Sequence, residues 1–170
     1  MDRQSNLSSH GGSMQKVVDV KVDLSHRSIK CGIIACIDSR FTESLNKFIK
    51  EYLGLTPEEI DIFRWAGGAK GLASPGNEHE RPFALNQLLI SAKEHHVRKF
   101  YLVVHSDCAG YGFPSFPSED EEKRFFSSEL KKAKLVAQEF LENVEIEGRK
   151  IEAEIITVFF SADGIWREIA

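Results

Sequence analysis

The chain has 170 residues, of which 42% are hydrophobic and 28% are charged, and its formal net charge is −4 at pH 7. That length predicts one domain with a real core, and that composition excludes a largely disordered chain. The acidic balance argues against nucleic acid as the main partner, because phosphate binding requires a basic surface. No apolar stretch approaches the roughly 18 residues of a membrane span, so we expect no membrane partner.

The cysteine content and the N-terminal segment together predict in which cellular compartment the protein lies. Three cysteines are too few for a disulfide scaffold. Residues 1–14 are polar and rich in Gly and Ser, and we expect them to form a disordered tail ahead of one α/β domain over residues 15–170. This tail lacks the apolar centre of a secretory signal, so we expect a cytoplasmic protein with reduced thiols.

The first part of the domain alternates between a strand pattern and a helix pattern. The apolar run 33–35 ends at Cys36 and predicts a short strand buried on both faces. Apolar residues then recur at helical spacing over 45–53, and Gly54 is placed to end that helix. Residues 60–63 predict a second strand.

A glycine-rich loop over 66–76 separates the second strand from a second helix. The loop does not match a phosphate-binding P-loop, because no Gly-Lys-Ser/Thr ends it. Apolar spacing over 85–92 predicts the helix, with Pro82 suited to its first turn. Residues 100–104 predict a third strand that ends at His105.

A long helix and a last strand complete the pattern. Apolar residues at steps of three and four predict a helix over 126–144, and a capping box of Ser118 with Glu121 could begin it. Residues 151–160 predict a fourth strand, and residues 164–170 predict a short tail or a final turn.

This alternation predicts a single-domain α/β fold with an open, mostly parallel sheet and helices on both faces. Right-handed crossovers narrow the topology, and we expect the strand order to be about 2-1-3-4. In that order strands 1 and 3 are neighbours at a switch point, where such sheets bind ligands beyond the carboxyl ends of their strands.

Two cysteines and a histidine stand at the ends of those two strands. Cys36 closes the first strand, whereas His105 and Cys108 close the third, in a His-x-x-Cys spacing that can bring both side chains to one ion. Two thiolates and one imidazole suit Zn²⁺. Three protein ligands leave the fourth tetrahedral position open, and an open position marks a catalytic zinc site rather than a structural one.

Asp38 and Arg40 follow Cys36 on the same turn and add a carboxylate and a guanidinium to the candidate site. A carboxylate beside a zinc-bound water can accept a hydrogen bond from it, and a guanidinium can keep that carboxylate ionised and oriented. Simpler interpretations stay open, with the cysteines as small buried hydrophobes and the charged pair as a structural salt bridge. Cys31 has no partner at a ligand spacing, so we expect a buried, inert thiol. The glycine-rich loop 66–76 is interpreted as a turn that lets the backbone approach this site.

Three motifs of this sequence resemble motifs of the β-class carbonic anhydrases. Residues 36–40 (CIDSR) look like the family's Cys-x-Asp-x-Arg motif. Residues 105–110 (HSDCAG) look like its His-x-x-Cys-Gly motif, with alanine in place of the first glycine. Residues 64–67 (RWAG) are similar to its Arg-Asn-Ala-Gly, with tryptophan in place of asparagine. The order and the spacing agree, and the resemblance covers about residues 30–110.

The resemblance implies that Cys36, His105 and Cys108 hold Zn²⁺, and that Asp38 and Arg40 form the catalytic dyad. It implies a lyase that hydrates carbon dioxide reversibly to bicarbonate by means of a zinc-bound hydroxide. It also implies a homodimer or a larger assembly of dimers, with the substrate pocket built in part by the partner chain.

Two departures from the family pattern leave alternative functions open. Trp65 places a large ring near the site, and no glutamine follows Gln15 before the first motif, where the family usually has one that lines the substrate pocket. These departures motivate a related zinc hydrolase that acts on a similar molecule, such as carbonyl sulfide or carbon disulfide. A third reading has Asp38 in the fourth position on zinc, which would make the protein a non-enzymatic zinc-binding module with a closed site.

Overall fold

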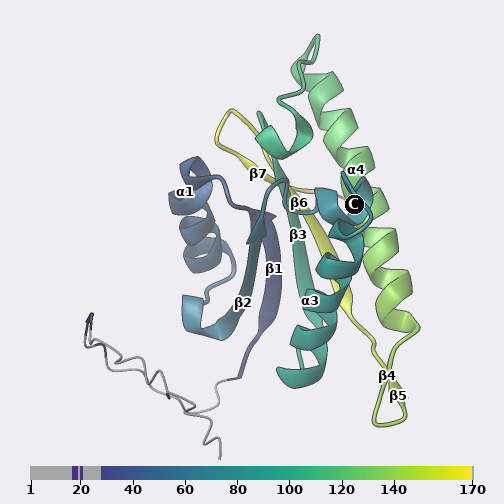
Figure 1. Cartoon of the computed structure of the whole chain (residues 1–170). Coiled ribbons are helices and arrows are strands. Elements are labelled where there is room, and N and C mark those ends of the chain that lie inside the picture. Colours follow the sequence, from purple (N-terminus) through teal and green to yellow (C-terminus); the bar gives the residue numbers. More distant parts are fainter. Residues whose placement is uncertain (1–16, 19, 21–27, 170) are drawn as a thin grey trace, which may run out of the picture.

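Five strands form one sheet in the order β2-β1-β3-β6-β7, and helices cover both of its faces (Figure 1). The strands are β1 (Cys31–Cys36), β2 (Ile60–Trp65), β3 (Lys99–His105), β6 (Glu154–Phe160) and β7 (Trp166–Ile169). A computed structural model describes the chain over residues 17, 18, 20 and 28–169. The predicted tail over residues 1–14 lies outside the described residues.

The first four strands of that order run parallel, which confirms the predicted order 2-1-3-4 and the open α/β sheet. All six residues of β1 are buried, as expected of a strand with a neighbour on each side and a helical layer on each face. β3 is nearly as enclosed, with six of its seven residues buried. Short, continuous apolar runs were informative here because central parallel strands bury both of their faces.

The end of the chain forms the strand β7, antiparallel to β6, so the prediction of a tail or final turn is wrong. The chain reverses at Asp163-Gly164, where Gly164 has a φ of +80° and its N–H donates to the Ser161 carbonyl at 3.0 Å. An Asp-Gly pair between apolar segments is a hairpin signal, and it marks this turn in the sequence. The reversal places Trp166 directly opposite Phe160 in the ladder.

Two helical layers enclose the sheet, as predicted. The helices are η1 (Ser39–Phe41), α1 (Thr42–Lys47), η2 (Phe48–Tyr52), η3 (Pro57–Glu59), α2 (Lys70–Ala73), α3 (Glu80–Glu94), η4 (Ala109–Tyr111) and α4 (Glu119–Glu142). Figure 1 shows α1 on one face of the sheet, with α3 and α4 on the other. The predicted helix over 45–53 is divided into α1 and one π-helical turn, η2, and the chain turns away at Gly54 with a φ of +66°.

Two hydrophobic clusters hold these layers together, one on each face of the sheet. Successive residues of a strand point to opposite faces, so Ile33 packs in the cluster of α1 and η2, whereas Ile34 packs in the cluster of α3 and α4. The predicted apolar stripe of α4 lies in the second cluster, where Phe126, Leu130 and Ala133 are fully buried.

The helix α4 begins seven residues before its apolar stripe. The Oγ of Ser118 accepts a hydrogen bond from the Glu121 N–H at 3.3 Å, which is the first half of the predicted capping box. Four acidic residues fill its first turn, where they complement the helix dipole. Within the described ranges, neither this helix nor any other is long and apolar enough to cross a membrane.

A small hairpin beyond the end of α4 was not predicted. It pairs β4 (Glu145–Ile146) with β5 (Arg149–Lys150). Its two turn residues, Glu147 and Gly148, have φ values of +51° and +74°, which is the geometry of a tight hairpin turn. Figure 1 shows this hairpin apart from the main sheet, at the end opposite the carboxyl ends of β1 and β3.

Candidate metal centre

The carboxyl ends of β1 and β3 lie side by side, because these strands are parallel neighbours. Cys36 is the last residue of β1, His105 is the last residue of β3, and Cys108 follows in the next turn. The ligand atoms of the three residues lie within 4.8 Å of one another. The sulfurs of Cys36 and Cys108 are 3.8 Å apart, although the two residues are 72 positions apart in the sequence. The fold therefore brings together all three residues that the sequence suggests as ligands.

The His105 ring is oriented so that one nitrogen is left to bind a cation. Its Nδ1 lies 2.7 Å from the Ser106 carbonyl oxygen, and because that oxygen can only accept, we assign the ring proton to Nδ1. Nε2 then carries a lone pair, and it is buried with no hydrogen-bond partner among the described residues. The ring of Phe41 covers the imidazole at a centroid distance of 4.0 Å. A buried nitrogen without a partner is costly unless a ligand satisfies it.

The two sulfurs share one hydrogen bond, which separates their acidities. Donation from the Cys108 thiol lowers the pKa of Cys36 below its ordinary value, and backbone N–H groups of Asp38 and Gly67 act in the same direction. The pKa of Cys108 is raised, because this thiol donates to the Cys36 sulfur and is buried. Metal binding removes the proton from a coordinating thiol, so both sulfurs can bind a cation as thiolates.

The donor set at this cluster fits Zn²⁺. Thiolate sulfur and imidazole nitrogen are the ligands that zinc prefers, and the unpartnered Nε2 of His105 supplies the nitrogen. All three residues are buried, which protects the ligands from competing water. Three ligands instead of four is the number found in catalytic zinc sites.

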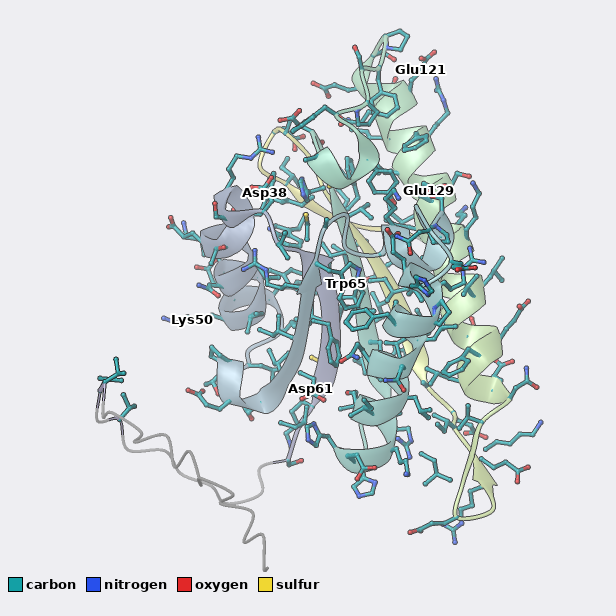
Figure 2. The ribbon with its side chains drawn as sticks, in the orientation of Figure 1. Asp38, Lys50, Asp61, Trp65, Glu121 and Glu129 are labelled. Atoms are coloured by element: carbon teal, nitrogen blue, oxygen red, sulfur yellow. The ribbon has the colours of Figure 1, made fainter. Side chains whose placement is uncertain are left out.

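Asp38 and Arg40 form a bidentate pair next to the cluster. The guanidinium donates from Nε to both carboxylate oxygens at 3.0 and 3.1 Å, and from Nη2 to Oδ2 at 2.7 Å. These bonds lower the pKa of Asp38 to about 2, so its carboxylate is ionised at neutral pH. Nη1 of Arg40 donates to Asp107 at 2.8 Å, which ties the turn after β1 to the turn after β3. Figure 2 shows Asp38 at this end of the sheet, beside α1.

Arg64 supports the same turn from β2, and no role for it was predicted. Its Nε donates to the Cys36 carbonyl at 2.9 Å and its Nη2 to the Asp38 carbonyl at 3.0 Å, while Nη1 reaches the Thr42 Oγ1 at 3.1 Å. One side chain thus fixes the backbone on both sides of the candidate ligand Cys36. Its place in the RWAG motif was the signal for such a role, and the residue that it contacts could be known only from the fold.

The glycine-rich loop approaches the cluster closely, which confirms the interpretation of its glycines. A Cβ on Gly68, which has a φ of +55°, would overlap the Val103 carbonyl oxygen and lie 3.0 Å from the Cys36 nitrogen. A Cβ on Gly110 would overlap the backbone of Gly67. These close approaches let the loop bring the Gly67 N–H to the Cys36 sulfur.

A small apolar cavity touches Cys36 and His105 on the α1 side of the sheet. Its volume is about 10 Å³, close to the smallest space that holds a water molecule. A wider groove of about 620 Å³ follows the outside of α4 and contains none of the candidate ligands, so it is not part of this site. The other residues that line the small cavity are apolar except for Arg64: Ala35, Phe41, Leu45, Val103, Phe160 and Trp166.

Trp65 does not line this cavity. Its indole N–H donates to the Gly68 carbonyl at 2.7 Å, and its ring meets the Phe83 ring of α3 at a centroid distance of 5.6 Å. Figure 2 shows Trp65 on the α3 side of the sheet, whereas the cavity lies on the α1 side. Trp65 therefore takes up no volume in the cavity next to Cys36 and His105.

Comparison with known proteins agrees with this geometry. The sequence profile of a family described as "Putative carbonic anhydrase" matches residues 26–158. Among solved structures, the chain is similar to a β-carbonic anhydrase, isoform I, from Trichomonas vaginalis, with 16% identity, coverage of 89% of this chain and 87% of that chain, and a TM-score of 0.55. This likeness supports a shared fold.

Two further solved structures are similar at lower TM-scores. One is the apo form of a carbon disulfide hydrolase, with 16% identity, coverage of 84% and 79% of the two chains, and a TM-score of 0.47. The other is from a study of two tetrameric β-carbonic anhydrases of Sordaria macrospora, with 18% identity, coverage of 85% and 82%, and a TM-score of 0.48. No curated protein sequence matches the chain significantly.

Proposed function

This chain belongs to the carbonic anhydrase family, and on that premise we propose that it is a zinc-dependent lyase that hydrates carbon dioxide reversibly to bicarbonate. One observation carries the proposal. The sulfurs of Cys36 and Cys108 and the unpartnered Nε2 of His105 converge at the carboxyl ends of two neighbouring strands. The reaction adds the oxygen of water to the carbon of carbon dioxide and releases one proton.

We assign Cys36, His105 and Cys108 as the ligands of Zn²⁺. When bound, this ion lowers the pKa of water to about 7 and so provides a hydroxide nucleophile near neutral pH. The chain prepares each ligand for this role. The Ser106 carbonyl holds the imidazole proton on Nδ1, and the N–H groups of Asp38 and Gly67 stabilise negative charge on the Cys36 sulfur.

We assign Asp38 to the orientation of the attacking water and Arg40 to the orientation of Asp38. The carboxylate is ionised at neutral pH, so it can accept a hydrogen bond from that water but cannot donate one. Arg40 occupies both oxygens of the carboxylate and also binds Asp107, which resists rotation of Asp38 toward the sulfurs. This arrangement favours an open fourth position over a closed, non-enzymatic site.

The apolar cavity suits carbon dioxide as the substrate. The molecule has no charge and no net dipole, so the rings and aliphatic groups around Cys36 and His105 can hold it without hydrogen bonds. The volume of about 10 Å³ leaves room for about one water molecule, so a substrate enters only as the surrounding side chains move, and the smallest molecules need the least movement. Carbonyl sulfide and carbon disulfide were considered because of Trp65 and the missing glutamine, and the first of these two reasons weakens because Trp65 does not line the cavity.

The deciding experiment measures the zinc content of the purified protein together with its rate of carbon dioxide hydration by stopped flow at mildly alkaline pH. We expect zinc bound at one site per chain and hydration well above the buffer rate. A matched pair of variants, Cys36→Ala and Cys31→Ala, separates a ligand from another buried cysteine of the same strand. Zinc-loaded protein without hydration would refute the lyase and favour the binding module.

The assembly and the location belong to the same proposal. We expect a homodimer or a larger homo-oligomer, because β2 is an edge strand of the sheet whose Ile62 is exposed. Light scattering of the purified protein tests this, and a monomer at micromolar concentration would contradict it. All three cysteines are free thiols, which fits the reducing cytoplasm.

A further inference from the structure

A continuous row of rings leads from the candidate ligand His105 toward the surface on the α1 side of the sheet. Each ring meets the next at a centroid distance typical of packed aromatic pairs. The distances are His105–Phe41 4.0 Å, Phe41–Phe160 5.2 Å, Phe160–Trp166 4.7 Å, Trp166–Phe48 4.6 Å and Phe48–Tyr52 5.1 Å. The inner end of the row is buried, and Tyr52 at its outer end is 62% exposed.

Two cavities lie along this row, and of the residues that the structure describes Trp166 alone lines both. The inner cavity is the space of about 10 Å³ that touches Cys36 and His105. The outer pocket has a volume of about 80 Å³ and ends at the exposed side chains of Tyr52 and Glu168. The Trp166 ring therefore stands between the candidate metal centre and a larger space that is open to solvent.

Contacts on both sides keep the Trp166 ring in that position. The residue pairs directly with Phe160 across the β6–β7 ladder, and the two rings pack at 4.7 Å. Its other face stacks on Phe48 with an interplanar angle of 19°. A large ring packed between two others has few alternative rotamers, so the indole forms a fixed wall.

We propose that Trp166 determines substrate size: its indole separates the two cavities and keeps the space beside Cys36 and His105 too small for bulky apolar molecules. The identity of the substrate rests on the proposed function. The separation itself is a property of the fold and can be tested without any reaction. A smaller residue at this position would join the inner cavity to the outer pocket and admit larger apolar molecules.

The first test measures benzene binding, with the imidazole proton signals of His105 as the probe in NMR spectra of the full chain as purified. Benzene cannot enter the wild-type inner cavity, so these signals should not move in the wild type. In Trp166→Ala a joined apolar cavity should bind benzene, as enlarged apolar cavities do, and should shift them. Tyr52→Ala is the matched control, because it removes a ring that lines only the outer pocket.

Two results would overturn the proposal. One is a benzene-dependent shift at His105 in the wild type or in Tyr52→Ala. The other is its absence in a folded Trp166→Ala. If Trp166→Ala does not fold, Trp166→Leu and Trp166→Phe provide a graded series. The shift at His105 should then be larger for the leucine variant than for the phenylalanine variant, and equal shifts would contradict the wall assigned to the indole.

The second test applies the same variants to catalysis and separates this inference from the proposed function. Trp166→Ala should raise kcat/KM for a bulky ester, 4-nitrophenyl acetate, relative to kcat/KM for carbon dioxide by about tenfold or more. An unchanged ratio in an active enzyme would contradict the size limit set by Trp166 but would not contradict the proposed hydration of carbon dioxide. A wild type without hydration would instead sink the lyase, while the benzene result would still decide the role of Trp166.

Discussion

The two cysteines of β1 have thiol pKa values that are shifted in opposite directions. Cys31 begins β1 and Cys36 ends it, and both side chains are buried, with 1% and 8% of their surface exposed. Burial among apolar neighbours raises the pKa of Cys31 to about 11. Donation from Cys108 and from backbone N–H groups instead lowers the pKa of Cys36 below its ordinary value. Burial alone therefore does not decide the chemistry of a thiol, because the donors around the sulfur decide it.

Two carboxylates at opposite ends of the sheet also differ in the groups that surround them (Figure 2). Asp61, near the start of β2, accepts a hydrogen bond from Ser91 at 2.6 Å and pairs with His95 at 2.8 Å. Both partners belong to the end of α3, so this cluster fastens a helix to an edge strand. Asp38 instead binds Arg40 on a turn beside three candidate metal ligands. In a parallel sheet the carboxyl ends are where turns can collect such groups.

The largest effect is expected when a sulfur is removed from the candidate metal centre at the carboxyl end of β1, and none is expected at its other end. Cys108→Ser should lose zinc and all measurable hydration, because a neutral hydroxyl is a poor replacement for a thiolate. Metal content by mass spectrometry and hydration by stopped flow measure the two effects. Cys31→Ser is the matched control and should keep both. Full zinc in Cys108→Ser, or loss of zinc in Cys31→Ser, would contradict the assignment of ligands.

The next largest effect concerns the close approach of the loop to Cys36. Gly68→Ala should destabilise the protein by about 3 kcal/mol or more, because its methyl group meets backbone atoms at a positive φ. Gly54→Ala is the control, since Gly54 also has a positive φ but open space around it, so it should lose only about 1–2 kcal/mol. Chemical denaturation measures both variants. Equal losses would show that backbone strain alone, and not contact with the site, fixes Gly68.

A smaller effect is expected when Asp38 loses its partner. Arg40→Ala should keep zinc and lower hydration by about 10- to 100-fold, because Asp38 is then free to rotate. Arg124→Ala, which removes another ion pair on the outside of α4, should leave the rate unchanged. Unchanged turnover in Arg40→Ala would make the Asp38–Arg40 pair an ordinary salt bridge, equivalent in kind to the Asp61 cluster.

The central strands could be predicted from the sequence, because they carry continuous apolar runs, which are typical of strands that are buried on both faces. The parallel order and the convergence of Cys36 with His105 followed from strand and crossover rules alone. The last strand of the sheet was harder to predict. β7 is a short edge strand, and the Asp-Gly turn before it was the one signal of a hairpin.

The environment of the site was less predictable than its ligands. Arg64 and Asp107 contact the Cys36–Arg40 turn from other strands and turns, at sequence separations of 26 to 67 residues. No local pattern encodes such partners, because they depend on the register between β1, β2 and β3. The inner cavity is a further case, since its wall at Trp166 comes from β7, which the sequence pattern did not reveal.

The last prediction concerns Cys31, at the other end of β1, and needs no metal. The folded protein keeps the Cys31 proton until about pH 11, whereas an unfolded chain releases it near the ordinary pKa of 9.0. Between these values the unfolded state binds fewer protons, so the free energy of unfolding should fall as pH rises, by about 2.7 kcal/mol from this group. Denaturation at several alkaline pH values measures the slope.

Cys31→Ala isolates this contribution, because every other titrating group stays in place. The variant should be less stable than the wild type at neutral pH, since it leaves a small cavity in β1, but its stability should fall less steeply above pH 9. Parallel pH profiles for the two proteins would mean that the Cys31 thiol is not kept neutral by its apolar surroundings. The pKa of Cys31 would then not be raised by burial, and the difference in acidity between the two ends of β1 would rest on Cys36 alone.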